Sequence, residues 1–95
     1  MNTPEIIQHR TKVSLPDMLN KVKRAEYVVL PDRRTTICIL TMENGYTVRG
    51  ESSCVSIENF NTALGEKYAY EKAVDNLWPL EGYLLAEEIF QRSKA

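Results

Sequence analysis

The sequence predicts an α+β fold with a short N-terminal helix, a three-stranded antiparallel sheet, and a long C-terminal helix kinked or broken at Pro79. Three observations predict it: apolar residues at helical spacing near the N-terminus, three following runs of β-forming residues, and renewed helical spacing up to residue 91. The 95 residues suffice for a single domain, which we place at residues 1–95. Residues 1–13 are expected to be irregular and residues 91–95 to be frayed.

The first helix is predicted to run from Ser14 to Arg24. Ser14 and Asp17 have the spacing of a capping box, and Pro16 is tolerated in a first helical turn. One face of this helix is apolar and consists of Leu15, Met18, Leu19 and Val22.

The three predicted strands are Glu26 to Leu30, Thr35 to Met42, and Tyr46 to Glu51. Asn44-Gly45 separates the last two and predicts a two-residue hairpin turn, because both residues tolerate positive φ. In that register the facing pairs are Met42 and Thr47, Leu40 and Arg49, and Cys38 and Glu51. The opposite face of the sheet then holds Ile37, Ile39, Val48 and Gly50.

The segment from Thr35 to Met42 is apolar on both faces, which predicts a central strand covered on each side. The segment from Tyr46 to Glu51 carries polar side chains on one face, so we expect it at the edge. A chain of 95 residues can hardly cover both faces of a sheet by itself. We therefore expect a homo-oligomer that uses the second face.

The C-terminal helix is predicted to begin at a cap formed by Ser56 or Asn59. Its apolar stripe consists of Phe60, Leu64, Tyr68, Ala73, Val74, Leu77 and Trp78. Pro79 disfavours helical geometry at the preceding residue, so the helix should kink or break there. Helical spacing then resumes from Leu80 to Gln91.

The composition is that of a folded domain, with 43% hydrophobic and 26% charged residues. The net charge of −1 argues against a basic nucleic-acid clamp, so nucleic acid is not expected as a partner. Residues 1–49 are nevertheless net basic and residues 50–95 net acidic. Residues 1–10 lack the apolar run of a secretory signal, and no segment is long enough to span a bilayer. We expect a cytoplasmic protein without a membrane partner.

Few residues suit catalysis or metal binding. Cys38 lies in an apolar run typical of a buried thiol, and Cys54 is distant in sequence, so two reduced cysteines are expected. His9 is the single histidine, which leaves a nucleophilic cysteine or serine without an obvious base. We expect no metal, no cofactor and no enzymatic activity.

The block from Gly50 to Cys54 has two interpretations. Its glycine, hydroxyls and backbone N–H groups suit an anionic ligand, but they equally suit the end of a strand with local hydrogen bonds. Arginines in the first half of the chain offer positive charge, and a tyrosine offers a ring for stacking a base. The candidate ligand-binding residues are Arg33, Arg34, Arg49, Glu51, Ser52, Ser53 and Tyr70.

Trp78 and Tyr83 flank the predicted break in the C-terminal helix. Large aromatic side chains commonly anchor interfaces, and they also supply much of the burial in a small core. Both residues are therefore candidate anchors, either of an interface or of the core.

Four blocks carry a resemblance to a known family: Gly45 to Val55, Asn59 to Asn61, Leu64-Gly65, and Leu77 to Tyr83. Over roughly residues 35–90 the chain resembles the small bacteriophage protein family named for gene products forty-nine and sixty-six of two enterobacterial phages. The predicted first helix lies outside this pattern. The resemblance implies a phage or prophage origin and expression in a bacterial cytoplasm, and it implies no particular activity.

Together these observations favour a non-catalytic, oligomeric phage accessory protein that counteracts a host defence by sequestering an anionic, nucleotide-type ligand. One alternative is direct inhibition of a host protein by the acidic C-terminal half. A further alternative is a nucleic-acid-binding regulator that uses the basic N-terminal helix.

Overall fold

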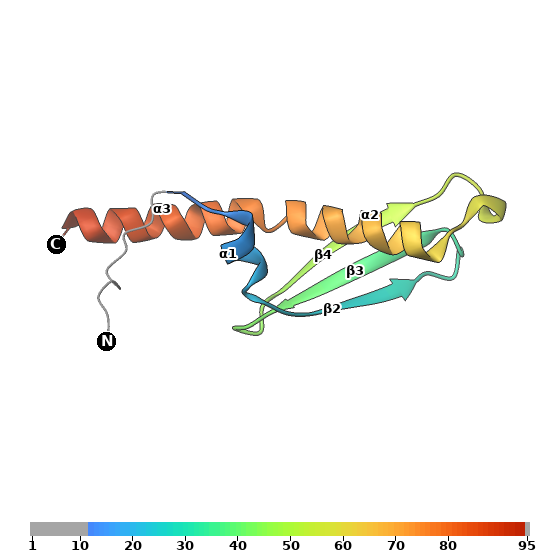
Figure 1. Ribbon diagram of the computed structural model, residues 1–95, viewed down its shortest axis with the longest axis horizontal. Coiled ribbons are helices and arrows are strands. Elements are labelled where there is room, and N and C mark those ends of the chain that lie inside the picture. Colours follow the sequence, from blue (N-terminus) through green and yellow to red (C-terminus); the bar gives the residue numbers. More distant parts are fainter. Residues whose placement is uncertain (1–11, 95) are drawn as a thin grey trace.

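The computed structural model describes residues 12–94 and shows an elongated α+β arrangement with principal extents of 58 × 25 × 19 Å (Figure 1). Its elements are α1 (Leu15–Leu19), β2 (Val22–Val29), β3 (Thr35–Met42), β4 (Thr47–Ser53), the 3₁₀ helix η1 (Ile57–Asn59), α2 (Thr62–Asp75) and α3 (Trp78–Lys94). The predicted fold class is confirmed.

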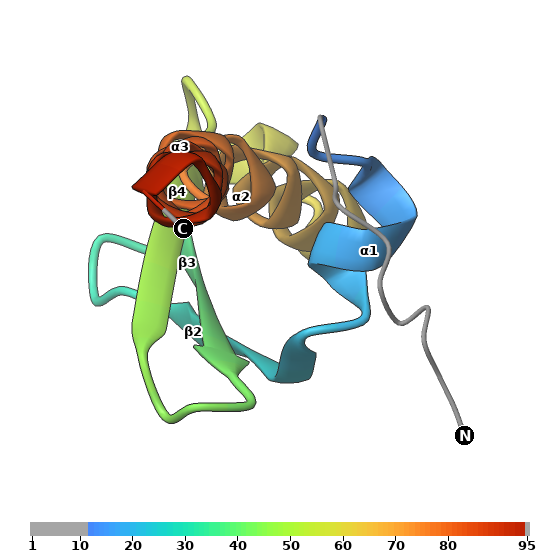
Figure 2. The same cartoon turned by 90° about the vertical axis from the view of Figure 1, so that its left-hand side faces the viewer.

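The three strands form one antiparallel sheet in the order β2-β3-β4, so β3 is central and β4 lies at an edge, as predicted. Helix α2 packs across β3 and β4. Helix α3 continues past the end of the sheet, and in Figure 2 the two helices are seen end on with the sheet on one side of them.

The core lies between α2 and the sheet. Its buried residues are Met18, Cys38, Leu40, Met42, Val48, Ala69, Ala73 and Leu77. The members from α2 are alanines, whose small side chains let the helix lie close to the strands. Cys38 is fully buried, as its apolar run predicts.

The first helix is much shorter than predicted. Ser14 caps it as expected, since its Oγ accepts a hydrogen bond from the Asp17 amide at 3.2 Å, but the helix ends at Leu19. The Lys21 carbonyl already accepts a hydrogen bond from the Glu43 amide at 2.8 Å, and β2 begins at the next residue. Pairing with β3 gives this backbone its hydrogen bonds and overrides the local helical pattern.

The predicted hairpin register is wrong by one residue. Gly45 has φ of 91°, but Asn44 stays in the usual negative region, so the turn is not the two-residue type. Instead the Gly45 amide donates to the Met42 carbonyl at 2.9 Å and the Met42 amide donates to the Tyr46 carbonyl at 2.8 Å. This is a three-residue loop in which a left-handed glycine forms a bulge.

The one-residue difference exchanges the faces of β4. Val48 pairs with Leu40 and Gly50 pairs with Cys38, so both lie on the face covered by α2 rather than on the opposite face. The opposite face presents the half-buried Ile37 and Ile39, with these β4 partners beside them: Glu51 and Arg49.

The C-terminal helix is broken, as expected, but before Pro79. Helix α2 ends at Asp75, and Asn76 and Leu77 form the turn to α3. Pro79 lies in the first turn of α3, where its missing N–H costs nothing. Asn61, rather than Ser56 or Asn59, caps α2 through a hydrogen bond from the Leu64 amide at 3.0 Å. Helix α3 continues to Lys94, through residues expected to fray.

Candidate functional site

A hollow of about 160 Å³ lies at the N-terminal end of α2, and we term it the Arg34 hollow. It lies between the turn joining β2 to β3, the end of β4 and the first turns of α2. Its lining residues are Arg34, Ser52, Ser53, Cys54, Asn59, Phe60, Asn61, Leu64, Gly65 and Tyr68.

Asp32 organises the turn that carries Arg34. One carboxylate oxygen accepts hydrogen bonds from the amides of Arg34 at 2.9 Å and Thr35 at 3.0 Å, and the other accepts from Thr35 Oγ1 at 2.7 Å. These bonds, the Thr35 hydroxyl first, lower the pKa of Asp32 from its ordinary value. Arg33 has a φ of 57°, which turns the chain just before β3 begins at Thr35.

The guanidinium of Arg34 is held at the rim of the hollow. Its Nη1 donates to the Val55 carbonyl at 3.2 Å, and the Arg34 carbonyl accepts from the Cys54 amide at 3.0 Å. A guanidinium has five N–H donors, so this single contact leaves donors that an anionic group can use.

The two serines of the hollow bind the protein itself. Ser52 Oγ donates to the Gly65 carbonyl at 2.9 Å, and Ser53 Oγ lies 3.3 Å from Thr35 Oγ1. Their hydroxyls therefore join β4 to its neighbours, as the strand-end interpretation of this block expects.

Gly50 does not provide an approach for a ligand. A β-carbon at this position would collide with the backbone of Ala73 and lie 2.6 Å from the Ala69 carbonyl oxygen. The backbone that lies against Gly50 is therefore that of helix α2 and not a space for a ligand. The register with β3 also continues without interruption through Gly50, so this glycine is not a bulge.

The other candidate ligand-binding residues lie elsewhere. Arg49 and Glu51 line a separate hollow of about 520 Å³ together with Lys72 and Asn76, whose Nδ2 donates to the Arg49 carbonyl at 2.7 Å. Tyr70 lies on another side of α2. Arg33 precedes Arg34 in the same turn but is not among the residues that line the Arg34 hollow.

Phe60 and Tyr68 are the aromatic residues that line the Arg34 hollow, whereas the sequence predicts Tyr70 in this role. Tyr68 is 48% exposed, whereas Tyr70 is partly buried against the core. The spacing of the two residues places them on different faces of α2, but it does not say which face meets the arginine.

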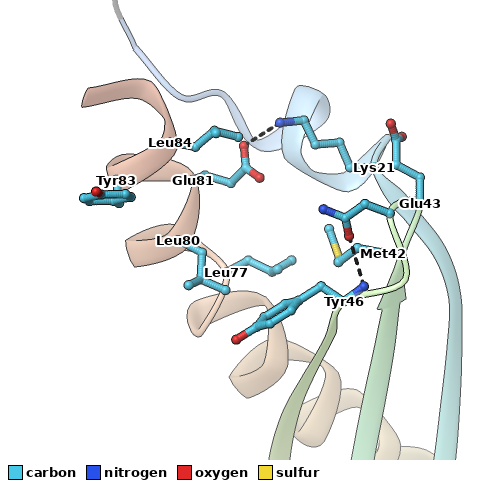
Figure 3. Close-up of a pocket in the computed structure, with 10 residues that line it drawn as sticks. Lys21, Met42, Glu43, Tyr46, Leu77, Leu80, Glu81, Tyr83 and Leu84 are labelled. Atoms are coloured by element: carbon cyan, nitrogen blue, oxygen red, sulfur yellow. Dashed lines mark hydrogen bonds and ion pairs between the residues drawn. The ribbon is translucent and has the colours of Figure 1, made fainter. Parts of the chain in front are cut away.

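A second hollow, of about 340 Å³, lies at the tip of the β3–β4 hairpin, and we term it the Tyr46 hollow (Figure 3). It was not anticipated, because three segments distant in sequence form it. Its lining residues are Lys21, Met42, Glu43, Asn44, Tyr46, Leu77, Leu80, Glu81, Tyr83 and Leu84. Lys21 Nζ and Glu81 Oε1 form an ion pair at 2.8 Å, and Glu81 is only 7% exposed.

Tyr83 projects from α3 and is 73% exposed, so it is not an anchor of the core. Trp78 is about one-third exposed. That Tyr83 anchors an interface stays a prediction.

Both cysteines are free thiols. Burial raises the pKa of the Cys38 thiol, which makes its thiolate scarce. Cys54 lines the Arg34 hollow, and its Sγ donates to the Ser56 carbonyl at 3.0 Å.

Within residues 12–94, no three histidine, cysteine or acidic side chains gather where they could hold a metal ion. In the same range, no helix has the length and apolar character needed to cross a membrane.

No curated protein and no solved structure matches the chain. A family model does match it over residues 10–89, which extends the likeness to the N-terminal region that the sequence motifs left out. Because this match spans most of the sequence, the chain belongs to the phage protein (N4 Gp49/phage Sf6 gene 66) family.

Proposed function

We propose that this phage protein is a non-catalytic binding protein of the host cytoplasm, acts as a homo-oligomer, and sequesters an anionic, nucleotide-type ligand. By binding this ligand, the protein would lower the concentration of a nucleotide signal that a host defence uses. The observation that carries the proposal is the position of Arg34 and Tyr68 on one hollow.

The chemistry of the Arg34 hollow suits a phosphate joined to a base. The guanidinium can donate two parallel hydrogen bonds to phosphate oxygens, and the half-exposed ring of Tyr68 offers a face for stacking. The amides of Asn59 and Asn61 add donors and acceptors. Among the described residues no carboxylate lines this hollow, and that of Asp32 lies behind Thr35, whose Oγ1 it binds at 2.7 Å.

The Arg34 hollow is small for a whole nucleotide. At about 160 Å³ it is smaller than the roughly 300 Å³ at which small-molecule pockets begin, so a single subunit encloses only part of a nucleotide.

The lining also supports binding without conversion. Cys54 is its one strong nucleophile within the described chain, and its Sγ donates a hydrogen bond to the Ser56 carbonyl. No described histidine or acidic residue lines the hollow to act as its base. A ligand held there would leave unchanged.

Titration calorimetry with a panel of cyclic mononucleotides and dinucleotides tests the proposal. We expect at least one to bind, and Arg34→Gln and Tyr68→Ala each to weaken binding by about tenfold or more. Arg33→Asn is the matched control: it removes the adjacent charge outside the hollow and tolerates the positive φ. Binding should then stay within about twofold of the unmodified chain.

Two outcomes would overturn the proposal. One is the absence of heat with every nucleotide of the panel. The other is an equal loss of affinity in Arg33→Asn and Arg34→Gln, which would indicate diffuse charge attraction rather than a site at Arg34.

A further inference from the structure

We propose that α3 is a self-association helix: two copies pair their α3 helices antiparallel, and Phe90 of each enters the Tyr46 hollow of the other. The inference rests on the homo-oligomer in the proposed function and names the surface through which the subunits meet.

Helix α3 exposes several large apolar side chains to solvent. It extends past the sheet, and α2 does not lie alongside it (Figures 1 and 2). Its exposed large apolar side chains are Trp78, Leu80, Tyr83, Leu84, Ile89 and Phe90. Helical spacing places Tyr83 and Phe90 on one side of α3, beside Leu80 and Leu84, and an exposed apolar surface of this kind marks a protein contact.

The Tyr46 hollow offers an apolar receptor at the base of the same helix. Leu80 and Leu84 of α3 form one wall, and Met42 and Tyr46 of the hairpin form another (Figure 3). Its volume of about 340 Å³ accommodates a phenyl ring. Phe90, 54% exposed near the other end of α3, supplies such a ring.

Because Phe90 and the Leu80–Leu84 wall of the Tyr46 hollow lie on the same helix, their spacing defines a register for two α3 helices related by twofold symmetry. In an antiparallel pair, placing Phe90 opposite the interval between Leu80 and Leu84 brings Ala86 opposite its own copy. Alanine at the crossing point permits close approach of the two helices. Tyr83, Ala86 and Phe90 have the three-and-four spacing of a helix–helix seam.

Charge favours a second copy in this orientation. The last turn of α3 is basic, with Arg92 and Lys94, while the rim of the Tyr46 hollow carries Glu43. The antiparallel register brings Lys94 toward the partner's hairpin tip and Glu43. A parallel pair would instead place the two basic ends together, where they repel.

Disulfide trapping tests the register. In a Cys54→Ser background, we expect Ala86→Cys to form a covalent dimer on mild oxidation, because the symmetry axis passes beside this residue. Ser93→Cys is the matched control on the same helix. It faces the region of Pro79 in the partner and should stay uncrosslinked. Equal crosslinking of both variants would contradict the antiparallel register.

Sedimentation of the uncrosslinked chain tests the contact. We expect a dimer that Phe90→Asp weakens by at least about tenfold, since the change places a charge in an apolar pocket. Ile57→Asp alters a side chain of similar exposure, 47%, far from α3, and should leave the dimer unchanged. Circular dichroism checks that both variants keep their helix content.

A monomeric unmodified chain, or a dimer that Phe90→Asp leaves intact, would overturn the proposal and assign the Tyr46 hollow to another occupant. Neither result bears on whether Arg34 holds a nucleotide, which calorimetry measures separately. Failure of the α3 contact is thus distinguishable from failure of the proposed ligand.

Discussion

Gly50 of β4 lies directly against the backbone of Ala73 in α2. A β-carbon at position 50 would overlap the Ala73 amide nitrogen and press on the Ala69 carbonyl oxygen. Because these neighbours are backbone atoms of a packed helix, they cannot rotate away. The contact sets how closely the C-terminal half of α2 approaches the sheet.

We therefore predict that Gly50→Ala lowers the free energy of unfolding by about 3 kcal/mol, the upper part of the range for overpacking. Gly82→Ala is the control, because a β-carbon there meets nothing within 4 Å and the residue lies within α3. It should raise stability by about 0.5–1 kcal/mol through helix propensity. Urea denaturation followed by circular dichroism measures both, and a Gly50→Ala variant as stable as the unmodified chain would contradict the packing.

The Lys21–Glu81 ion pair should matter more than the exposed pair of Arg24 and Glu26. Lys21→Met leaves the buried Glu81 carboxylate without its cation, and we expect a loss of about 2 kcal/mol. Arg24→Met should change the free energy of unfolding by less than about 0.5 kcal/mol. The side chains of Arg24 and Glu26 are both solvated, and their charged groups are 3.4 Å apart.

A double-mutant cycle separates this pair from simple packing. Adding Glu81→Leu to Lys21→Met removes the stranded charge and should recover most of the loss. Losses that simply add would show that the two groups do not interact.

Thr36 carries a hydroxyl that is buried and finds no hydrogen-bond partner within the described part of the chain. Thr36→Val keeps the shape and removes the unsatisfied group, so we expect stability to rise by about 1 kcal/mol. A thermal melt measures the change. A destabilised variant would mean that the hydroxyl has a partner in solution.

Asp32 should make stability depend on pH in the acid range. Its pKa is lowered in the folded chain, so folding favours the ionised form. The contribution is fully present above the ordinary aspartate pKa and disappears as the pH falls through the lower folded-state pKa. The stability gap between the unmodified chain and Asp32→Ala should therefore close in acid. A gap that persists unchanged there would contradict this role.

The Thr35 hydroxyl is the largest cause of that lowered pKa. Thr35→Val should return the pKa of Asp32 toward its ordinary value, as measured by NMR titration of the carboxyl group. An unmoved pKa would assign the effect to the backbone amides instead.

The sequence predicts the helices and strands because their patterns are strong, and it places β3 at the centre because that strand is apolar on both sides. The hairpin register was missed because Asn44-Gly45 fits both a two-residue turn and a three-residue loop with a glycine bulge. An apolar β3 accepts either register, so its own pattern could not decide which face Val48 joins.

The N-terminal region was misjudged for a different reason. Residues 20–24 continue a helical pattern, yet pairing with β3 begins at Val22. Strand β2 lies at an edge of the sheet and is mostly exposed, so the polar side chains of these residues remain in solvent. Tertiary hydrogen bonding thus outweighs a weak local preference.

The candidate site was partly predictable. Arg34, Ser52 and Ser53 meet because β3 and β4 pair as neighbours, a relation that the hairpin pattern predicts. The choice of Tyr68 over Tyr70 depends on how α2 is rotated on the sheet. The Tyr46 hollow depends on where α3 leaves α2, and no local pattern specifies that angle.

Native mass spectrometry of the chain purified from bacterial host cells tests the central claim most directly, because it reports subunit number and retained ligand together. The account predicts an oligomer carrying an added mass of nucleotide size, and the same oligomer without that mass in Arg34→Gln. A bare single chain from both proteins would contradict it.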